Sequence, residues 1–383
     1  MVGNAPERTF KSPERARIDP ERLPERLSAL AGLDRVREAA AGTPVYLVGG
    51  AVRDLLLGRE RTDLDLVVEG DAAELGQRLG GEVHAHERFA TARVRTDELE
   101  LDLATARSES YPAPGALPEV RPATLAEDLA RRDFTVNAMA LPLTGDAELI
   151  DPHAGLADLE TGALRVLHER SFVDDPTRAL RAARYAGRYG FELERRTAEL
   201  LRDADLETVS NDRIEAELRK LAAEPRPRRG FELLDDWGLV PLAEGAGRLI
   251  DSVAGLMATA AWSGVADRDD AVLAAASGRG LPGARELAHA KVTLPSEGVE
   301  LARRYDGVTL ALGRALGAAW LDRYLEEWRD VRLDIDGGDL MEAGIPEGPA
   351  IGRGLAAAMR AKLDGEVRGA DEELRVALEA ARA

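Results

Sequence analysis

Cysteine is absent from this 383-residue sequence, so the chain can form no disulfide, thiolate metal site or cysteine nucleophile. This absence fits a reducing cytoplasm, which is where we expect the protein. The sequence also lacks any run of about 18 apolar residues, so we expect no transmembrane helix. The start of the chain is charged and rich in proline and has no apolar core of a signal peptide. We therefore expect a flexible arm over residues 1–25.

Lysine is scarce, since only four of the 51 basic residues are lysines, and the 70 acidic residues bring the net charge to −19. Such an acidic balance argues against a protein that coats nucleic acid nonspecifically, but it is compatible with an enzyme that has a local basic groove. Hydrophobic residues make up 45% of the chain, which is enough for sizeable cores. The length predicts two or three domains.

The pattern of apolar residues changes near residue 155. Before that point short apolar or alternating runs predict strands, and after it long segments rich in Ala, Leu, Arg and Glu predict helices. The segment 108–123 contains four prolines and is expected to be a loop. The fold class is therefore α+β, with a head over 26–150, a helical neck over 151–224 and a helical body over 225–383. Strands are expected at 45–48, 64–68, 82–86, 91–96, 98–106 and 139–143, and helices at 177–188, 196–204, 211–223 and 228–237.

Two aspartates alternate with leucines in the segment TDLDLVV at 62–68, which contains the expected strand 64–68. Asp63 and Asp65 should project from one face of this strand, because residues i and i+2 share a face. Paired carboxylates repel each other, and a hard divalent cation such as Mg²⁺ relieves that repulsion. Asp102 could add a third carboxylate if its strand lies beside the first, with Glu100 as the alternative. Three such carboxylates can hold two metal ions for phosphoryl chemistry. A solvent-exposed strand would show the same alternation without any metal.

Two consecutive glycines follow the first expected strand and open a helix. Gly49 and Gly50 would let a triphosphate approach the backbone at the helix N-terminus, with Arg53 and Asp54 one turn further on. The residues match neither the G-x-G-x-x-G pattern of dinucleotide-binding folds nor the G-K-[ST] of a Walker A loop. A tight turn alone would also explain the glycines.

Two further clusters combine arginine with acceptors. Arg132, Asp133 and Asn137 could bind triphosphate oxygens and a ribose hydroxyl, although an exposed ion pair is the simpler interpretation. Asp175 and Arg178 could together imitate a base edge, since Arg donates to acceptors and Asp accepts from an exocyclic amine. The alternative is that Asp175 caps the helix. A stripe of arginines on the same helix face either lines a groove or is solvated; its members are Arg178, Arg181, Arg184 and Arg188.

In combination and in order, these motifs resemble the tRNA nucleotidyltransferase/poly(A) polymerase family. The resemblance is strong over 45–221 and weaker toward the C-terminus. The segments that carry it are GGAVRD at 49–54, DLD at 63–65, LDLATARSESY at 101–111, EDLARRDFTVNAMA at 127–140, DPHAGLADL at 151–159, DDPTRALRAARYAGRYGF at 174–191 and DRIEAELRKL at 212–221.

The resemblance implies a polymerase-β-like nucleotidyltransferase head with a mixed sheet, followed by a neck that recognises the nucleotide base and a body that binds RNA. It implies Asp63, Asp65 and Asp102 as catalytic residues, with Mg²⁺ on Asp63 and Asp65. It also implies nucleotide binding by the glycine turn and both arginine clusters. In the second cluster the family's usual first residue is Glu, whereas this chain has Asp174. The nucleotide-binding set is Gly49, Gly50, Arg53, Asp54, Arg132, Asp133, Asn137, Asp174, Asp175, Arg178, Arg181 and Arg184.

The implied reaction is template-independent addition of C and A, from CTP and ATP, to the tRNA 3′ end. Relatives that stop after CC tend to lack the segment 108–123, so its presence favours CCA addition, followed by A-only addition and poly(A) synthesis. An inactive RNA-binding relative is the alternative from another class. A fused phosphohydrolase is disfavoured, because no adjacent His-Asp pair occurs. The sequence does not determine an oligomeric state.

Overall fold

The chain divides into two units, Met1–Pro225 and Arg226–Ala383, each with its own internal contacts. The boundary falls in the EPRPRR segment, where prolines and arginines interrupt the helical pattern. Each unit is described by itself below. The computed structural model describes residues 18–59, 64–86, 91–96, 100–144 and 148–383.

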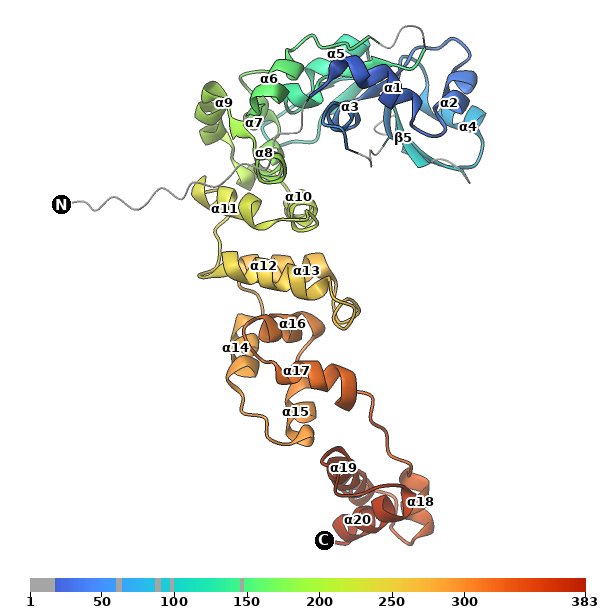
Figure 1. The fold of residues 1–383 in the computed structure, drawn as a ribbon, viewed down its shortest axis with the longest axis vertical. Coiled ribbons are helices and arrows are strands. Elements are labelled where there is room, and N and C mark those ends of the chain that lie inside the picture. The colour runs from blue at the N-terminus through green and yellow to red at the C-terminus, as the bar shows by residue number, and fades with distance from the viewer. Residues whose placement is uncertain (1–17, 60–63, 87–90, 97–99, 145–147) are drawn as a thin grey trace, which may run out of the picture. The chain divides into compact units, whose positions relative to one another are not determined.

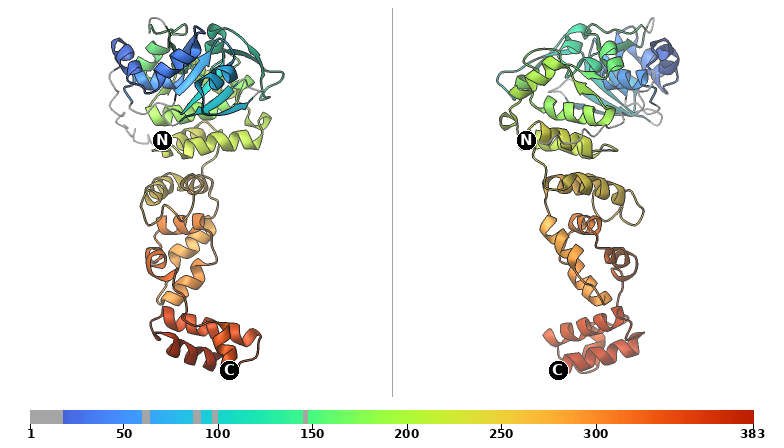
Figure 2. Two further views of the ribbon diagram at one scale, coloured as in Figure 1. Left: turned by 90° about the vertical axis from the view of Figure 1, so that its right-hand side faces the viewer. Right: turned by 60° about the vertical axis from the view of Figure 1, so that its left-hand side comes forward.

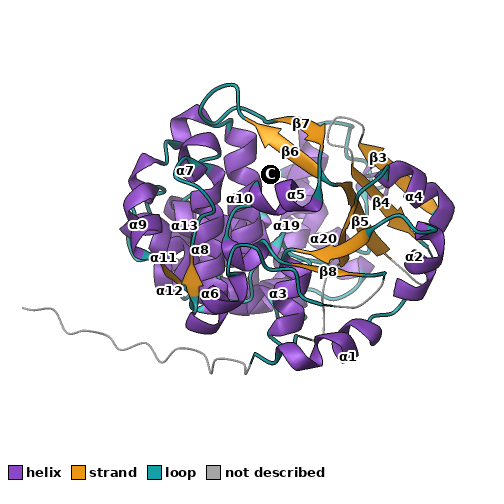
Figure 3. Ribbon diagram, turned by 90° about the horizontal axis from the view of Figure 1, so that it is seen from above, coloured by secondary structure: helices purple, strands orange, loops and turns teal. Residues whose placement is uncertain are grey.

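The first unit is built on a mixed six-stranded sheet, as the sequence predicted, with strand order β3-β4-β5-β2-β1-β8 (Figure 3). Strands β2 and β5 run parallel, and the other neighbours in this sheet are antiparallel. The strand sequences explain the sheet, because β4 and β5 alternate buried with more exposed residues, whereas the apolar strands β1 and β2 are buried over most of their length. The strands are β1 Val45–Val48, β2 Leu64–Val68, β3 Glu82–His86, β4 Thr91–Arg95, β5 Glu100–Thr105 and β8 Ala140–Pro142.

Helices pack against the strands of this sheet. Helix α4 contacts β4 and β5 and is itself covered by α2, while α3 contacts β1 and β2 (Figure 1). Asp71 caps α4 by accepting from the backbone N–H groups of its first turn, and Leu75 and Leu79 on the next turns are buried. The helices of this part are α1 Leu23–Ser28, α2 Leu33–Ala40, α3 Gly50–Leu56, α4 Ala72–Leu79 and α5 Leu125–Ala130.

The first described residues differ from the flexible arm that was expected over 1–25. Residues 1–17 lie outside the described residues, but a 3₁₀ turn at Pro20–Arg22 leads directly into α1. Leu23 and Leu27 are one helical turn apart and are both buried, at 2% and 1% exposure. These two leucines attach residues 20–28 to the core, so the helical fold begins before residue 25.

The proline-rich segment 108–123 also differs from expectation, because it is not simply a loop. Strands β6 Arg107–Ser110 and β7 Glu119–Pro122 pair antiparallel in a separate two-stranded sheet. Three of the four prolines lie in the connection between these strands. Pro122 is the last residue of β7, where its missing N–H costs least at the end of an edge strand. The prolines therefore mark the turn of a hairpin and the end of one strand.

The rest of the first unit is mainly helical. Helix α8 packs against α7 and α10, and a short parallel pair of strands, β9 and β10, joins the segments around them. The expected helix 196–204 is shorter than predicted, since α9 ends at Leu200 and a 3₁₀ turn follows. The elements are α6 Gly155–Thr161, β9 Ala163–Leu164, α7 Ser171–Asp174, α8 Thr177–Tyr189, β10 Glu192–Leu193, α9 Arg195–Leu200 and α10 Asn211–Ala222.

Every described element of the second unit is a helix, as expected for the body (Figure 2). Its last three helices share a small core of Leu340, Ala358 and Ala377 with neighbouring apolar residues. Across the described part of the chain, no helix is both long and apolar enough to span a bilayer. The helices are α11 Arg228–Asp236, α12 Ala246–Met257, α13 Arg268–Ser277, α14 Leu281–His289, α15 Pro295–Ala302, α16 Gly307–Ala315, α17 Trp320–Arg323, a π-helical turn Tyr324–Trp328, α18 Gly337–Glu342, α19 Pro349–Leu363 and α20 Ala370–Arg382.

Candidate nucleotide-binding site

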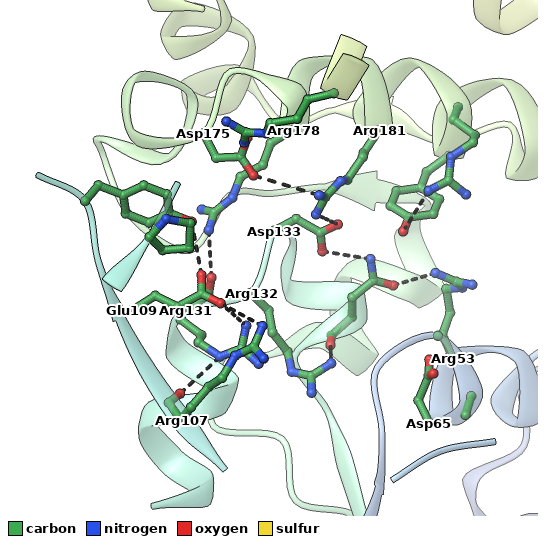
Figure 4. Close-up of a pocket in the computed structure, with 18 of the residues that line it drawn as sticks. Arg53, Asp65, Arg107, Glu109, Arg131, Arg132, Asp133, Asp175, Arg178 and Arg181 are labelled. Carbon is green, nitrogen blue, oxygen red and sulfur yellow. Dashed lines mark hydrogen bonds and ion pairs between the residues drawn. The ribbon is translucent and has the colours of Figure 1, made fainter. Parts of the chain in front are cut away.

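A cavity of about 580 Å³ opens in the first unit between the sheet, the β6–β7 hairpin and α8 (Figure 4). Its lining contains nine arginines and five carboxylates, so it is strongly polar and carries an excess of positive charge. Such a lining suits a polyanionic ligand. The residues predicted for nucleotide binding or catalysis that line it are Gly50, Arg53, Asp54, Asp65, Arg132, Asp133, Asn137, Asp175, Arg178, Arg181 and Arg184.

The glycine turn connects β1 to α3 at the edge of this cavity. Gly49 has φ +68° and ψ −128°, a conformation that side chains other than hydrogen rarely adopt. An added Cβ at this position would lie 2.5 Å from Nη1 of Arg132. Gly49 is therefore required both by its backbone conformation and by the close approach of Arg132. Gly50 begins the helix and lines the cavity.

Asp65 and Asp102 are register partners on the parallel strands β2 and β5, and both are exposed. Leu66, the next residue of β2, is buried at 1% exposure, which is the alternation that the sequence predicted. Arg93 on β4 donates to both oxygens of Asp102, at 2.8 and 3.0 Å. Asp63 lies outside the described residues, so its position is not part of this comparison. The structure thus brings Asp102 beside Asp65, and only Asp65 of the two lines the cavity.

Glu100, the alternative third carboxylate, lies two residues before Asp102 on the same strand and pairs with Arg95 at 3.0 Å. Within the described residues, no group of three metal-ligating side chains is already assembled. Nevertheless, Asp65 and Asp102 offer oxygen donors, the type that Mg²⁺ prefers. Arg93 pairs with Asp102 through an exposed ion pair, which contributes little stability. This donor set is chemically suited to a hard divalent cation.

Arg53 links the helix after the glycine turn to α8. Its guanidinium donates to Asn137 Oδ1, to Asp54 Oδ1 at 3.0 Å and to the Tyr189 hydroxyl at 2.7 Å. The same group lies over the rings of Tyr185 and Tyr189, with its Cζ 5.2 and 4.5 Å from their centroids. Burial would lower the pKa of Arg53, but Tyr189 and Asp54 outweigh burial and raise it. Arg53 is therefore a fixed cation whose donors are directed by the protein.

The side chain of Asn137 connects Arg53 to Asp133 through two hydrogen bonds. Because Asn137 Oδ1 accepts from Arg53, its Nδ2 is left to donate to Asp133 Oδ1 at 2.9 Å. The other oxygen of Asp133 faces Arg181 at 3.9 Å (Figure 4). Burial would raise the pKa of Asp133, but Arg181 and the hydrogen bonds from Asn137 and the Phe134 N–H hold it below its ordinary value. Asp133 is thus ionised and can accept from a ligand hydroxyl.

Arg131 and Arg132 share one buried carboxylate on α5. Asp128 is fully buried, and its two oxygens accept from Arg131 at 2.7 Å and from Arg132 at 2.9 Å. Burial would raise the pKa of Asp128, but the two guanidinium groups lower it. Asp128 is therefore a buried anchor that holds Arg132 at the cavity, beside the glycine turn.

Asp175 and Arg178 do not share a helix face through an ion pair, because α8 begins only at Thr177, after Asp175. Asp175 Oδ1 accepts from the Thr177 N–H at 3.1 Å and from Arg213 at 2.9 Å, but the N-cap residue of α8 is Pro176, so Asp175 is not the cap that the alternative interpretation expected. Its Oδ2 faces Arg181 at 3.8 Å. Asp175 and Arg178 are still brought together, because both line the cavity and both are almost fully buried.

The arginine stripe on α8 lines the cavity with all four of its members. Two buried glutamates of the α10 region support it: Glu217 pairs with Arg181 at 3.3 Å, and Glu224 pairs with Arg188 at 3.4 Å. Burial would lower the pKa of Arg181, but Glu217 and the aspartates of the cavity raise it. The stripe is therefore a groove lining and not a solvated face.

Three predicted residues stand apart from the cavity lining: Gly49, Asp102 and Asp174. Asp174 is the position that departs from the family's usual Glu, and it accepts a hydrogen bond of 2.9 Å from Arg170, four residues earlier. Conversely, Arg213, which the nucleotide-binding set did not include, lines the cavity and bridges Asp175 to the Gly115 carbonyl at 2.6 Å. Sequence reasoning also left out several hairpin and helix residues of the lining; they are Arg107, Glu109, Tyr111, Leu117, Pro118 and Tyr185. The resemblance segments contain most of them, which is the signal that could have found them.

Comparison with known families identifies two regions of the chain. A family model described as the poly A polymerase head domain matches residues 45–165. A second, described as a probable RNA and SrmB-binding site of polymerase A, matches residues 190–242. All residues of the candidate site up to Asn137 fall in the first match.

Curated relatives differ in the product that their names state. The A-adding tRNA nucleotidyltransferase of Halalkalibacterium halodurans is 47% identical over 206 residues, which cover 50% of this chain and 48% of the relative. That of Aquifex aeolicus is 52% identical over 165 residues, 42% of this chain and 20% of the relative. The chain therefore matches less than half the length of these two relatives. The CC-adding enzyme of Deinococcus radiodurans is 37% identical over 361 residues, with 91% of this chain and 92% of the relative covered.

Solved structures agree with the full-length match. An apo form of a CCA-adding enzyme has a TM-score of 0.75 at 30% identity, covering 95% of this chain and 96% of the other. The Thermotoga maritima CCA-adding enzyme in complex with tRNA has a TM-score of 0.68 at 30% identity, with the same coverage of both chains. The likeness therefore extends over both units of the chain.

Proposed function

Because the chain belongs to the tRNA nucleotidyltransferase/poly(A) polymerase family, we propose that it adds C and A residues to the tRNA 3′ end. It would use CTP and ATP as substrates, release pyrophosphate and need no nucleic-acid template. The observation that carries this proposal is the single cavity in which Asp65, the glycine turn and the Asp175–Arg178 pair meet. A carboxylate for phosphoryl chemistry, a phosphate-binding surface and a base-reading pair are the three parts that this reaction requires.

Nucleoside triphosphate binding follows from the distribution of charge. Nine arginines line the cavity, and Arg132 is held at the glycine turn by buried Asp128. Arginine binds phosphate oxygens bidentately, and the turn brings the backbone close to them. Asp133, kept ionised and oriented by Asn137, is an acceptor for a ribose hydroxyl. Triphosphate and ribose would thus be bound by different sides of one cavity.

Base selection would depend on Asp175 and Arg178. Cytosine and adenine both present an amine next to a ring nitrogen acceptor, which matches one carboxylate acceptor and one guanidinium donor. Asp175 Oδ1 accepts from Thr177, which leaves Oδ2 toward the cavity arginine Arg181, and Arg178 is fixed by its own hydrogen bonds. Uracil and guanine present a carbonyl where this arrangement requires an amine. A protein surface could in this way select C and A without a template.

Asp65 and Asp102, with Asp63 two residues before Asp65 in the sequence, are the residues that would hold Mg²⁺. Two such ions, when bound, lower the pKa of the attacking 3′-hydroxyl and stabilise the leaving pyrophosphate. The protein residues position the partners: Asp65 lines the cavity, and the arginines bind the triphosphate. The second unit, together with the match at 190–242, would bind the tRNA.

CC addition is the second candidate product. The presence of segment 108–123 disfavours it, but the relative that matches nearly the whole chain is named a CC-adding enzyme. To identify the product, purified protein is incubated with CTP, ATP or both and the length of the extended tRNA is measured. Three tRNAs are used, which lack the whole CCA end, end after the first C, or end after CC. Complete extension of all three supports CCA addition, and arrest after two C residues supports CC addition. Extension of only the CC-ended tRNA indicates an A-adding enzyme, and long A tails indicate a poly(A) polymerase.

A further inference from the structure

Arg178 is held at the cavity by three acceptors, one of which is a histidine. Its Nη1 donates to Ser171 Oγ at 2.7 Å and lies 3.3 Å from Nε2 of His168, and its Nη2 donates to the Arg131 carbonyl at 2.7 Å. Arg178 is only 3% exposed, so water cannot replace a lost partner easily. The plane of the guanidinium group is therefore determined by these three neighbours.

We propose that His168 is a positioning residue for nucleotide selection, because its neutral Nε2 accepts from Arg178 and orients the guanidinium group toward the base. The inference rests on the proposed function, in which Arg178 reads the base. A histidine that accepts through Nε2 must carry its proton on Nδ1 and be uncharged. A second proton on the ring would remove the acceptor and place a cation against Arg178.

The surroundings of His168 favour the neutral form at ordinary pH. Partial burial and Arg178 lower the pKa of His168, Arg170 acts in the same direction, and Asp174 opposes them. With the folded pKa below the ordinary value, the neutral ring predominates at neutral pH. Protonation occurs only as the pH falls below about 6.5. Nucleotide selection should therefore weaken in mild acid, while remaining constant from neutral pH upward.

Two substitutions of His168 separate positioning from a merely structural role. His168→Gln keeps an acceptor near Nε2 but cannot be protonated in this range, whereas His168→Leu removes the acceptor. His289→Gln is the matched control, since His289 is an exposed residue of the other unit. Ser171→Ala removes the second acceptor of Nη1 without removing a titratable group. Circular dichroism and thermal melting establish that each variant is folded.

The test measures CTP and UTP binding by calorimetry, and their incorporation into tRNA, at pH 5.5, 6.5 and 7.5. We expect His168→Leu to lower the preference for CTP over UTP about tenfold at every pH, the size of one hydrogen bond to a charged group. We expect wild-type protein and His289→Gln to lose preference only at pH 5.5, and His168→Gln to keep it throughout. Ser171→Ala, which keeps His168, should have a lower preference than the wild type by the same factor at all three pH values, and it should still lose preference at pH 5.5.

The inference is overturned if His168→Leu binds CTP and UTP like the wild type. It is also overturned if His168→Gln loses preference in acid as the wild type does. The proposed function has a separate readout, because wild-type protein that binds CTP selectively but does not incorporate it would contradict the enzyme and leave the positioning role standing. Wild-type protein that does not bind CTP would contradict both.

Discussion

Replacing Gly49 with alanine tests the glycine turn, because two independent effects of the substitution can be worked out from the structure. The first is backbone strain: φ +68° with ψ −128° is disfavoured for alanine and costs about 1–3 kcal/mol. The second is steric, since the new Cβ would lie 2.5 Å from Arg132 Nη1. Arg132 must move and lose its 3.4 Å contact with the Asn137 carbonyl.

The expected result is a less stable protein that also binds triphosphates less tightly. For a unit of roughly 200 residues, a loss of 1–3 kcal/mol lowers the Tm by roughly 3–10 °C. Displacement of Arg132 should raise the KM for CTP and ATP several-fold, because this arginine lies where the turn would meet phosphate. Calorimetric melting and steady-state incorporation measure the two effects separately.

The neighbouring glycine is a matched control. Gly50 is the first residue of α3 and has no positive φ, and an added Cβ would meet Arg53 Nη2 at 3.4 Å, an ordinary contact. Gly50→Ala should therefore change the free energy of unfolding by no more than about 1 kcal/mol. If Gly49→Ala melts like Gly50→Ala and binds nucleotide like the wild type, the turn does not require its special conformation, and the reasoning is refuted.

Two further substitutions test the supports of the cavity. Tyr189→Phe removes the hydroxyl contacts to Arg53 and to Asp54, so it should lower the free energy of unfolding by about 2 kcal/mol, measured by urea titration. The control is Tyr185→Phe, which should lower this free energy less, because the Tyr185 hydroxyl has one long contact of 3.5 Å. Equal losses would show that the Tyr189 hydroxyl is not the support. Arg213→Met removes the cation between Asp175 and the hairpin, so it should raise the KM for CTP and ATP about tenfold in steady-state assays. The control is Arg219→Met, at an exposed residue, which should leave this KM unchanged. An unchanged KM for Arg213→Met would rule out this coupling.

Much of the head could be predicted because local sequence determines it. The alternation in the segments of β2 and β5 fixes which face of each strand is apolar, and it correctly places Asp65 and Asp102 on exposed faces. The parallel pairing that makes them register partners could be stated only as a condition, because pairing depends on contacts between segments distant in the chain. Helix α8 is also determined by local sequence, since the expected bounds 177–188 differ from the observed Thr177–Tyr189 by one residue.

The errors have physical causes. Prolines predicted a loop at 108–123, but three of them occupy only the turn, and the strands on either side pair with each other. Asp175 and Arg178 are three residues apart, yet Pro176 precedes α8, so Asp175 lies outside the helix and accepts from Thr177 instead of sharing a helix face with Arg178. Arg213 has no local signal for function, since its partners Asp175 and Gly115 come from distant segments.

Supports of the site were the hardest features to predict. Arg53 is held by Asn137 and by Tyr189, which are 84 and 136 residues away in the chain. Asp128 anchors two arginines from a fully buried position that its sequence context did not indicate. Composition and periodicity identify which side chains can bind a nucleotide, whereas tertiary contacts decide how they are oriented.

The most direct test of the account is single-turnover addition of labelled CTP or ATP to tRNA that lacks its 3′ residues, with Asp65→Asn compared to wild type. The exposed Glu82→Gln, on edge strand β3 of the same sheet, is the control. The account predicts that Asp65→Asn lowers the rate by at least about 100-fold while tRNA affinity and Tm stay unchanged, and that Glu82→Gln behaves as the wild type. A wild-type rate for Asp65→Asn would contradict the claim that this carboxylate supports nucleotidyl transfer.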